Sequence, residues 1–140
     1  MTGGVLAIDW GARKSGFAVT DALHVTLTPL DPLRVSGDAP ELLAHVAALL
    51  DERDVGTLLV GLPLNMDGTD GPAAQAARAF AERLAARFPA LRVELQDERL
   101  TTKEAEEELR AAGFHGRKMR ERRDSQSALV ILRDWLAENE

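Results

Sequence analysis

The period of the hydrophobic pattern changes after the first third of this chain, and that change constrains the fold more than any other feature. The first third holds three short apolar segments, separated only by brief polar turns, at residues 4–9, 16–20 and 25–30. Connections this short join antiparallel neighbours in a sheet. Beyond residue 38 the apolar residues recur at helical spacing and alternate with further strand-like segments. The chain therefore predicts an α/β fold that begins with a three-stranded meander.

Helical and extended segments alternate through the middle of the chain. Asp38 and Glu41 occupy the two positions of a capping box, which predicts a helix start. The apolar run at 57–61 predicts a buried strand, and a helix over 72–88 is bounded by a proline on each side. Residues 92–96 alternate between apolar and polar side chains, which is typical of a half-buried strand. The helices between these strands supply the crossovers that parallel pairing requires.

Two helices complete the chain. Thr101 and Glu104 form a second capping box, opening a helix that ends near Gly113, and the last helix is expected to begin near Asp124. The element order is thus βββαβαβαα. This order predicts an RNase H-like α/β fold, in which a mixed five-stranded sheet carries helices on both faces. Prolines in the third strand place that strand at the edge of the sheet.

Composition restricts the chemistry that such a chain can perform. Its 140 residues suffice for a core, so residues 1–140 are expected to form a single domain. Cysteine is absent and three histidines are scattered, which excludes thiolate metal sites and disfavours a zinc enzyme. Oxygen ligands for Mg²⁺ or Mn²⁺ remain. No apolar run reaches membrane-spanning length and no signal-peptide pattern begins the chain, so we expect a cytoplasmic protein.

Charge is distributed unevenly along the chain. The net charge of −6 argues against a protein that coats nucleic acid nonspecifically, but it does not exclude an enzyme that acts on nucleic acid. A basic run over residues 117–123 follows an acidic block. Such runs often bind polyanions, and the alternative is a solvated surface. The basic side chains of the run are Arg117, Lys118, Arg120, Arg122 and Arg123.

Three acids stand where predicted elements begin or end: Asp9, Glu98 and Asp124. Asp9 closes the first apolar strand, at the edge where a buried sheet meets solvent. Ligands of open α/β sheets bind beyond the carboxyl ends of the strands. Acids gathered at such an edge repel one another unless a cation neutralises them, and carboxylates are ligands that Mg²⁺ and Mn²⁺ prefer. The pattern therefore indicates a metal site for phosphoryl chemistry.

Each acid also has an ordinary structural explanation. Asp9 could form a turn by bonding nearby backbone N–H groups, and Asp124 could cap the last helix. Alternation is unreliable at a strand end, so it does not decide between Asp97 and Glu98. These two acids could be a surface pair with Arg99 as their counter-charge. Spacing by itself leaves all of these choices open.

The segment 60–69 is unusual for a connection between a strand and a helix. Apolar residues flank a proline, and small polar residues then gather before a helix N-terminus. Free N–H groups at a helix N-terminus favour phosphate. Asn65 could therefore contact phosphate or order water. The plainer alternative is a turn at Asp67 and Gly68 followed by a helix cap.

These residues together resemble the bacterial YqgF (RuvX) family, from about Val5 to Trp135. Four segments carry the resemblance, and the second and third are highly specific. They are Ile8-Asp9-Trp10-Gly11 with Arg13 and Gly16, Val60-Gly61-Leu62-Pro63-Leu64-Asn65-Met66-Asp67-Gly68-Thr69, Asp97-Glu98-Arg99-Leu100-Thr101-Thr102, and Asp124-Ser125-Gln126-Ser127-Ala128.

The resemblance implies an RNase H-like nuclease domain related to the Holliday-junction resolvase RuvC. It implies that Asp9, Glu98 and Asp124 are the catalytic acids, and it thereby selects Glu98 over Asp97. The family is commonly assigned to maturation of the 5′ end of 16S ribosomal RNA, and sometimes to junction resolution. A nuclease acting on structured nucleic acid is therefore the first expectation.

Such a nuclease is expected to hold one or two Mg²⁺ or Mn²⁺ ions between its three acids. One ion would activate a water, and the other would steady the leaving oxygen. Arg13, Lys14, Arg99 and the basic run over 117–123 would bind flanking phosphates, a contribution that salt should weaken. Asn65 would position the substrate backbone.

Three alternatives remain beside precursor rRNA processing. A resolvase acting on branched DNA would require a two-fold homodimer to cut symmetric strands. An ATP-binding domain of the actin/Hsp70 type shares the strand–Asp–Gly opening but needs a second lobe, for which 140 residues are too few. A catalytically silent nucleic-acid-binding factor would bind without metal-dependent turnover. The expected partner is thus nucleic acid, and no membrane association is expected.

Overall fold

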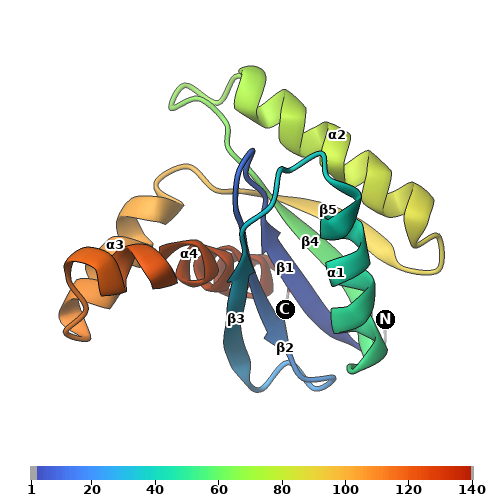
Figure 1. Ribbon diagram of the computed structural model, residues 1–140, viewed down its shortest axis with the longest axis horizontal. Coiled ribbons are helices and arrows are strands. Elements are labelled where there is room, and N and C mark those ends of the chain that lie inside the picture. Colours follow the sequence, from blue (N-terminus) through green and yellow to red (C-terminus); the bar gives the residue numbers. More distant parts are fainter. Residues whose placement is uncertain (1–2, 140) are drawn as a thin grey trace.

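A computed structural model describes residues 3–139, and it contains one five-stranded sheet flanked by helices (Figure 1). The strands are β1 (Gly4–Asp9), β2 (Ser15–Thr20), β3 (Leu27–Leu33), β4 (Val55–Leu62) and β5 (Arg92–Asp97). The helices are α1 (Pro40–Asp51), α2 (Pro72–Arg87), α3 (Thr101–Ala111) and α4 (Gly116–Asn139). The predicted element order is confirmed.

The sheet is mixed, with strand order β3-β2-β1-β4-β5. The first three strands form an antiparallel meander, whereas β1, β4 and β5 run parallel to one another. Strand β3 is an edge strand, as its prolines predicted, because proline cannot donate to a central ladder. The carboxyl ends of β1, β4 and β5 consequently meet at one edge of the sheet. Strand β3 runs in the same direction as β1 and also ends there.

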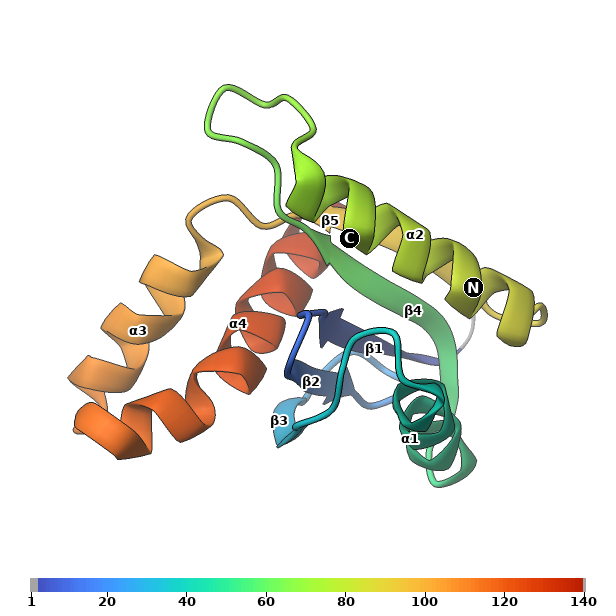
Figure 2. The ribbon, with the colours of Figure 1, turned by 45° about the horizontal axis from the view of Figure 1, so that its top comes forward.

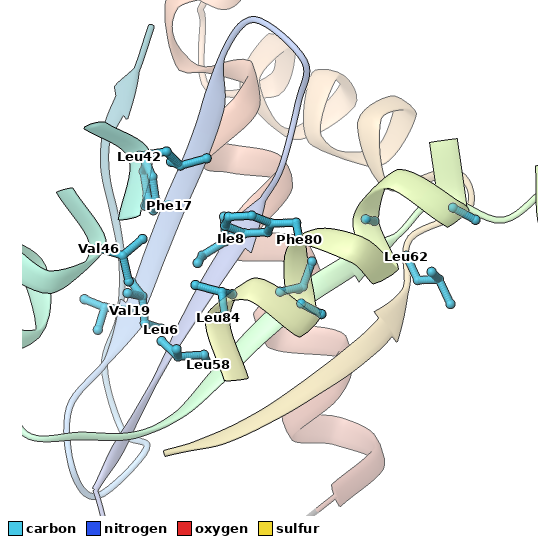
Figure 3. Packing of buried hydrophobic residues seen from close by; sticks show 14 residues of the cluster. Leu6, Ile8, Phe17, Val19, Leu42, Val46, Leu58, Leu62, Phe80 and Leu84 are labelled. Carbon is cyan, nitrogen blue, oxygen red and sulfur yellow. The ribbon is translucent and has the colours of Figure 1, made fainter. Parts of the chain in front are cut away.

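One face of the sheet is covered by α1 and α2. Apolar side chains of both helices pack against the alternate residues Leu6 and Ile8 of β1, together with neighbours from β2 and β4 (Figure 3). Phe80 of α2 and Leu42 of α1 are fully buried in this layer. Because Leu6 and Ile8 share one face by the two-residue period of a strand, the helices above them have a continuous apolar surface to cover.

The opposite face is covered by the second half of α4. Ile131, Leu132 and Trp135 pack there against Val5 and Ala7, the other alternate residues of β1. Strand β1 is therefore buried on both faces, which explains why its sequence is an unbroken apolar run. Helix α3 lies against α4 rather than on the sheet, and the two form a hairpin that extends to one side (Figure 2). No helix within residues 3–139 is both long and apolar enough to cross a membrane.

Both predicted capping boxes are wrong. Helix α1 begins at Pro40 with Ala39 as its N-cap, and no side chain caps it. Instead, Ser36 Oγ accepts the Asp38 backbone N–H at 3.3 Å, so a serine turn leads into the helix. Helix α3 likewise has Leu100 as its N-cap, in the left-handed conformation with φ 68°, which places Thr101 inside the helix.

The last helix begins at Gly116, well before the predicted start near Asp124. Asp124 therefore lies in the third turn of α4 and does not cap it. The basic run forms the first two turns, where Arg123 donates to Glu106 of α3 at 3.0 Å. Packing against α3 makes this highly charged segment helical, and a tertiary contact of that kind leaves no local signal in the sequence.

Candidate active site

Two of the three predicted acids are fixed at the carboxyl edge of the sheet by backbone pairing. Asp9 is the last residue of β1, and Glu98 directly follows β5. The Glu98 backbone N–H donates to the Leu62 carbonyl of β4 at 3.1 Å, which extends the β4–β5 ladder by one residue. Both acids therefore occupy rigid positions on either side of β4.

Glu98 reaches Asp9 by crossing over β4, the strand that separates them, and Gly61 makes the crossing feasible. A Cβ at this position would lie 2.8 Å from Glu98 Cδ and Oε1, and 2.6 Å from Cδ1 of Ile131 in α4. A side chain at position 61 would thus displace the carboxyl group of Glu98 and the side chain of Ile131. A glycine inside a strand often marks a close approach of this kind.

Asp9 and Glu98 share a hydrogen bond. Burial and repulsion from Asp124 raise the pKa of Asp9 to about 7, although the hydrogen bond from Glu98 acts to lower it. Burial, repulsion from Asp9 and the same hydrogen bond raise the pKa of Glu98 to about 9, with Asp97 adding further repulsion. Near neutral pH Glu98 therefore keeps its proton and donates it to Asp9.

Asp124 comes to the same edge from α4. Gly16 of β2 pairs with Asp9, and a Cβ on Gly16 would lie 2.2 Å from the backbone carbonyl of Asp124. The helix can approach the strand this closely only because residue 16 has no side chain. Ser125 Oγ accepts the Phe17 N–H at 3.3 Å, which fixes this turn of α4 on β2. The three acids of the prediction are thus brought to one place.

Lys14 neutralises Asp124. Its Nζ lies 2.7 Å from Asp124 Oδ2, and the two side chains are only 21% and 22% exposed. Asp124 Oδ2 is buried and accepts no well-aligned hydrogen bond within residues 3–139, so Lys14 supplies charge there rather than an oriented donor. The prediction gave Lys14 to a substrate phosphate. In this structure its partner is an acid of the cluster.

The acid cluster is not a finished cation site. Across residues 3–139, no three acidic, histidine or cysteine side chains are spaced to hold one ion as they stand. Two contacts explain this: the Asp9–Glu98 hydrogen bond and the Lys14–Asp124 ion pair both engage oxygens that a cation would need. Removing the shared proton and releasing Lys14 would free carboxylate oxygens, which hard cations prefer.

Asp97 is engaged away from the cluster by Arg99. The Arg99 backbone N–H donates to Asp97 Oδ1 at 2.9 Å, and Arg99 Nε donates to Oδ2 at 2.9 Å. Burial acts to raise the pKa of Asp97, but these bonds hold it below its ordinary value. The structure therefore places Glu98 beside Asp9, a choice that strand alternation had left open. The Asp97–Arg99 pair is the counter-charge arrangement considered for the sequence.

The loop between β4 and α2 is closed by its own polar groups. Asn65 Nδ2 donates to Thr69 Oγ1 at 3.0 Å, and the Asn65 N–H donates to the Thr69 carbonyl at 2.9 Å. Asp67 Oδ1 accepts from both the N–H and the hydroxyl of Thr69. Arg99 Nη1 donates to the Met66 carbonyl at 3.1 Å, which ties this loop to the end of β5. Asn65 is thus held in an ordered, exposed loop beside the acid edge.

The basic residues predicted for phosphate contacts fall into two groups. Arg13 is exposed on the β1–β2 turn, close in sequence to Asp9. The run over 117–123 lies instead on the α3–α4 hairpin, to one side of the sheet (Figure 2). The structure therefore does not gather all of the predicted basic side chains around the acids.

Several basic side chains of the run contact the hairpin itself. Arg123 pairs with Glu106, and the Arg122 guanidinium lies 4.2 Å from the centroid of the Phe114 ring. Arg117 pairs with Glu121 at 3.3 Å on the helix surface. Lys118 and Arg120 are exposed, and neither has an ion pair in the part of the chain that the structure describes.

The site depends on three small residues to which no role in positioning the acids was assigned. They are Gly16, Gly61 and Ser125, which set how closely β2, β4 and α4 approach the acids. Glycines within strand-like segments were the available signal for the first two, since a glycine weakens a strand unless close approach requires it. Nothing local distinguishes Ser125 from an ordinary helix residue.

Comparison with protein families and curated proteins gives one consistent result. A family model described as "RuvX: Holliday junction resolvase" matches residues 3–138. A candidate pre-16S rRNA nuclease of Anaeromyxobacter sp. (strain Fw109-5) is 49% identical over 94% of both chains. Another from Haemophilus ducreyi is 39% identical over 96% of both chains. A third, from Lactiplantibacillus plantarum, is 40% identical over 94% of this chain and 92% of its own.

Among solved structures, the chain is similar to T. thermophilus RuvC in complex with a Holliday junction substrate. The TM-score is 0.57 at 16% sequence identity, and the match covers 92% of this chain and 90% of RuvC. At this level of identity the similarity bears on the fold, and it confirms the predicted RNase H-like architecture. The common fold places the carboxyl edge of the sheet, where the acids gather, in the usual position for a ligand.

Proposed function

The chain belongs to the RuvX family, and from that premise we propose that it is a divalent-metal-dependent nuclease that processes precursor 16S rRNA. Asp9, Glu98 and Asp124 are the acids to which we assign catalysis and metal binding. One observation carries this assignment: Asp9 and Glu98 share a hydrogen bond at the sheet edge while Asp124 repels Asp9. Buried acids that repel one another at the edge where open α/β sheets bind their ligands indicate a positively charged ligand.

The residues present fit a hard divalent cation. The three acids offer carboxylate oxygens, and Asp124 Oδ2 lacks an aligned hydrogen-bond donor among residues 3–139. When bound, Mg²⁺ or Mn²⁺ would activate a water and neutralise the leaving oxygen of the phosphodiester. Asp9, Glu98 and Asp124 would hold the ion, and Glu98 would give up its proton as positive charge arrives.

The side chains around the acids would bind and orient the substrate strand. Lys14 would leave Asp124 and pair with a substrate phosphate, because the phosphate also offers an anionic oxygen to its ammonium group. Arg13 lies on the same turn and would contact the next phosphate. Arg99 fixes the loop that carries Asn65, so both would define the path of the substrate backbone. Four basic residues on α4 would attract the flanking strand, whereas Arg123 is held by Glu106. The four are Arg117, Lys118, Arg120 and Arg122.

Precursor 16S rRNA is the preferred substrate because the similar curated proteins are named for it. The description of the matching family supports a second candidate, a resolvase acting on Holliday junctions in DNA. That activity would require a two-fold homodimer, so that two active sites can cut symmetric strands. We further propose that residues 1–140 act as a single nuclease domain in the cytoplasm.

A cleavage panel separates these functions. Wild-type protein would be incubated with a precursor 16S rRNA fragment or a synthetic four-way DNA junction, in Mn²⁺, Mg²⁺ or EDTA. We expect metal-dependent cleavage of the rRNA precursor. Asp9→Asn should lower cleavage by about a thousandfold or more, because several kcal/mol of transition-state stabilisation depend on the metal, while binding persists. Asp97→Asn, the matched change next to the cluster, should retain cleavage.

Three outcomes of the panel would contradict parts of the proposal. Full activity of Asp9→Asn would remove the assignment of the acids. Preferred cleavage of the four-way junction, together with a dimer in solution, would favour the resolvase. Binding of RNA without any metal-dependent turnover would indicate a catalytically silent factor.

Thermal unfolding tests metal binding without relying on activity. Mn²⁺ at about a hundred times its Kd should stabilise the protein by roughly 2.7 kcal/mol, and each kcal/mol raises the Tm by about 2–4 °C for a chain near this size. We therefore expect a Tm increase of roughly 5–10 °C for wild type and little or none for Asp124→Asn. An equal increase in both proteins would place the metal elsewhere.

A further inference from the structure

A second site lies beside the acid cluster, in a pocket of about 650 Å³ between the end of β3 and the α3–α4 hairpin. Leu33 of β3 pairs with Ser15 of β2, and the next residue of β2, Gly16, pairs with Asp9. The end of β3 is therefore at the same sheet edge as the acids. Ser125, which follows Asp124 in α4, contributes to the pocket wall.

The pocket is near enough to the acids for one substrate strand to contact both. Strands β3 and β1 are separated by two strand spacings of about 4.8 Å, or roughly 10 Å in all. A stacked nucleic-acid strand rises by about 3.4 Å for each nucleotide. The pocket is thus about three nucleotides from a phosphate held at Asp9.

The walls of the pocket combine flat apolar surfaces with a stacked cation. Phe114 and Leu109 come from the hairpin, and Pro29 and Pro32 come from β3. The Arg122 guanidinium lies over the Phe114 ring, 4.2 Å from its centroid. Unpaired nucleobases are recognised by stacking on aromatic rings and on arginine planes. A pocket of this volume is also within the range that accommodates a small organic ligand.

The charges at the pocket favour an anionic ligand. Arg34 and Arg122 line it, and Arg34 has no ion pair within residues 3–139. Of the two acids in the wall, Glu121 is paired with Arg117 at 3.3 Å, which leaves Asp31. The local balance is therefore positive although the whole chain carries −6. A base with its phosphate matches this combination of apolar wall and positive charge better than an uncharged ligand does.

We propose that this pocket binds one unpaired nucleotide of the substrate strand, within about three nucleotides of the scissile phosphate. The base lies against Phe114 and the phosphate faces Arg34. The proposal rests on the nuclease function and adds a substrate class to it. Bases of a continuous duplex are stacked within their pairs and cannot enter the pocket, so the enzyme selects the boundary between paired and unpaired nucleic acid.

Binding of a fluorescent RNA tests the pocket independently of cleavage. The probe is an RNA hairpin with a 5′ single-stranded extension, carrying 2-aminopurine at one of the three unpaired nucleotides next to the stem. The reference is the same stem with a blunt end. Both are bound to the Asp9→Asn protein in Mg²⁺, which leaves the RNA intact. Phe114→Ala and Arg34→Ala are then added to that protein, with Arg92→Ala as the matched control.

The control is matched because Arg92 is the first residue of β5 and therefore lies at the edge of the sheet away from the acids. Phe114→Ala should weaken binding of the extended hairpin roughly 5- to 100-fold, the effect of losing one base–aromatic stack, and change the blunt stem less than twofold. Fluorescence should be quenched on binding at one of the three positions, and Phe114→Ala should abolish the quenching. Arg34→Ala should weaken the same probe a few-fold, and Arg92→Ala should change neither.

Circular dichroism and the Tm would reveal whether Phe114→Ala disturbs the hairpin. If it does, Arg34→Ala still tests the pocket, because Arg34 is exposed and its removal should not affect folding. Unchanged binding and quenching in both variants would overturn the proposal while leaving the acids and the nuclease function untouched. Equal losses on the extended and blunt probes would also overturn it. Conversely, selective binding by a wild type that cleaves nothing would support the pocket and contradict the nuclease function.

Discussion

The acids at the sheet edge and the acids of the α3–α4 hairpin have opposite surroundings. On the hairpin, Glu106 accepts from Arg123 at 3.0 Å, and Glu108 is held by Arg133 and Gln126. The pKa of Glu108 consequently lies below its ordinary value even though burial acts to raise it. At the sheet edge, burial and mutual repulsion raise the pKa values of Asp9 and Glu98.

This difference shows how the chain separates structure from function. On the hairpin, a carboxylate paired with arginine helps to dock one helix on another. Its negative charge is already balanced by a side chain of the same chain. Two acids that must share a proton lower the stability of the free protein near neutral pH, because burial penalises their charged forms. A buried arrangement that destabilises the free protein indicates a role in binding, where the missing positive charge is supplied.

Among changes that compare the sheet edge with the hairpin, the largest effect is expected where the backbone approach that forms the acid edge is blocked. Gly16→Ala would place a Cβ 2.2 Å from the Asp124 carbonyl, so α4 must move away from β2. A displacement of about 1 Å at a catalytic group can lower the rate about a hundredfold, and we expect a loss of this size in the cleavage assay. Overpacking should also cost roughly 1–3 kcal/mol of stability in urea unfolding.

The matched change on the hairpin is Gly113→Asn. Its side chain would enter open space, and asparagine tolerates a positive φ better than other non-glycine residues. Cleavage should therefore be unchanged. If Gly16→Ala also cleaved at the wild-type rate, the close approach of α4 would have no part in placing Asp124.

A smaller effect is expected on how stability depends on pH. The stability contributed by Glu98 should fall as pH rises, whereas that contributed by Asp97 should increase. The folded pKa of Glu98 is about 9, above its ordinary 4.5, so the stability it contributes is complete below about pH 4.5 and is lost as pH rises toward 9. Glu98→Gln cannot ionise. In EDTA at pH 8 it should be more stable than wild type by about 1–3 kcal/mol, whereas at pH 4.5 the two should be nearly equal.

Asp97 provides the comparison, because its folded pKa lies below the ordinary value. The stability that ionised Asp97 contributes to the fold is present above the ordinary pKa of an aspartate. It is lost as pH falls through the lower folded pKa. Asp97→Asn should therefore be less stable than wild type at pH 8, by roughly 0.2–1 kcal/mol for a partly exposed ion pair. Urea unfolding of both variants at pH 4.5, 6 and 8 measures the two slopes. Slopes of the same sign would remove the distinction between the acids.

The smallest effects should separate the basic side chains of the hairpin. Lys118 is exposed and has no ion pair within residues 3–139, so Lys118→Ala should weaken RNA binding and reduce the salt slope by about 1. Arg123 is paired with Glu106, so Arg123→Ala should mainly lower stability, by at most about 1 kcal/mol. Binding titrations at several salt concentrations, with unfolding curves for both variants, give the comparison. An equal change of salt slope in both would show that the Glu106 pair does not restrain Arg123.

Local patterns predicted the elements whose formation depends on their own residues. The apolar run ending at Asp9 and the alternation from 92 to 96 identified β1 and β5 nearly to their observed bounds. The start of α2 predicted at Pro72 is confirmed. Proline fits the first helical position because the backbone N–H that it lacks has no partner there. The mixed sheet followed from the element order and from short connections in its first third.

The helix starts show where local patterns failed. Asp38 and Thr101 have the residue types of caps, but a serine turn leads into α1 and a left-handed Leu100 leads into α3. The start of α4 was placed eight residues too late, since docking on α3 rather than capping decides where that helix begins. At α1 and α3 the turn that leads into the helix takes the place of a side-chain cap, which contributes about 1 kcal/mol, and at α4 the contact with α3 lies outside any local pattern.

The sequence by itself determined that β1 is buried on both faces and that Asp9 closes it, because the spacing of apolar residues is a local property. It also marked Asp9 and the Asp97–Glu98 pair as acids at strand ends, whereas the helix start predicted near Asp124 is wrong, because Asp124 lies inside α4. Only the tertiary structure decided that Glu98, rather than Asp97, crosses Gly61 to Asp9, and that Asp124 arrives from inside α4 over Gly16. These contacts join residues far apart in the chain, so their geometry depends on strand order and on how closely two backbones can approach.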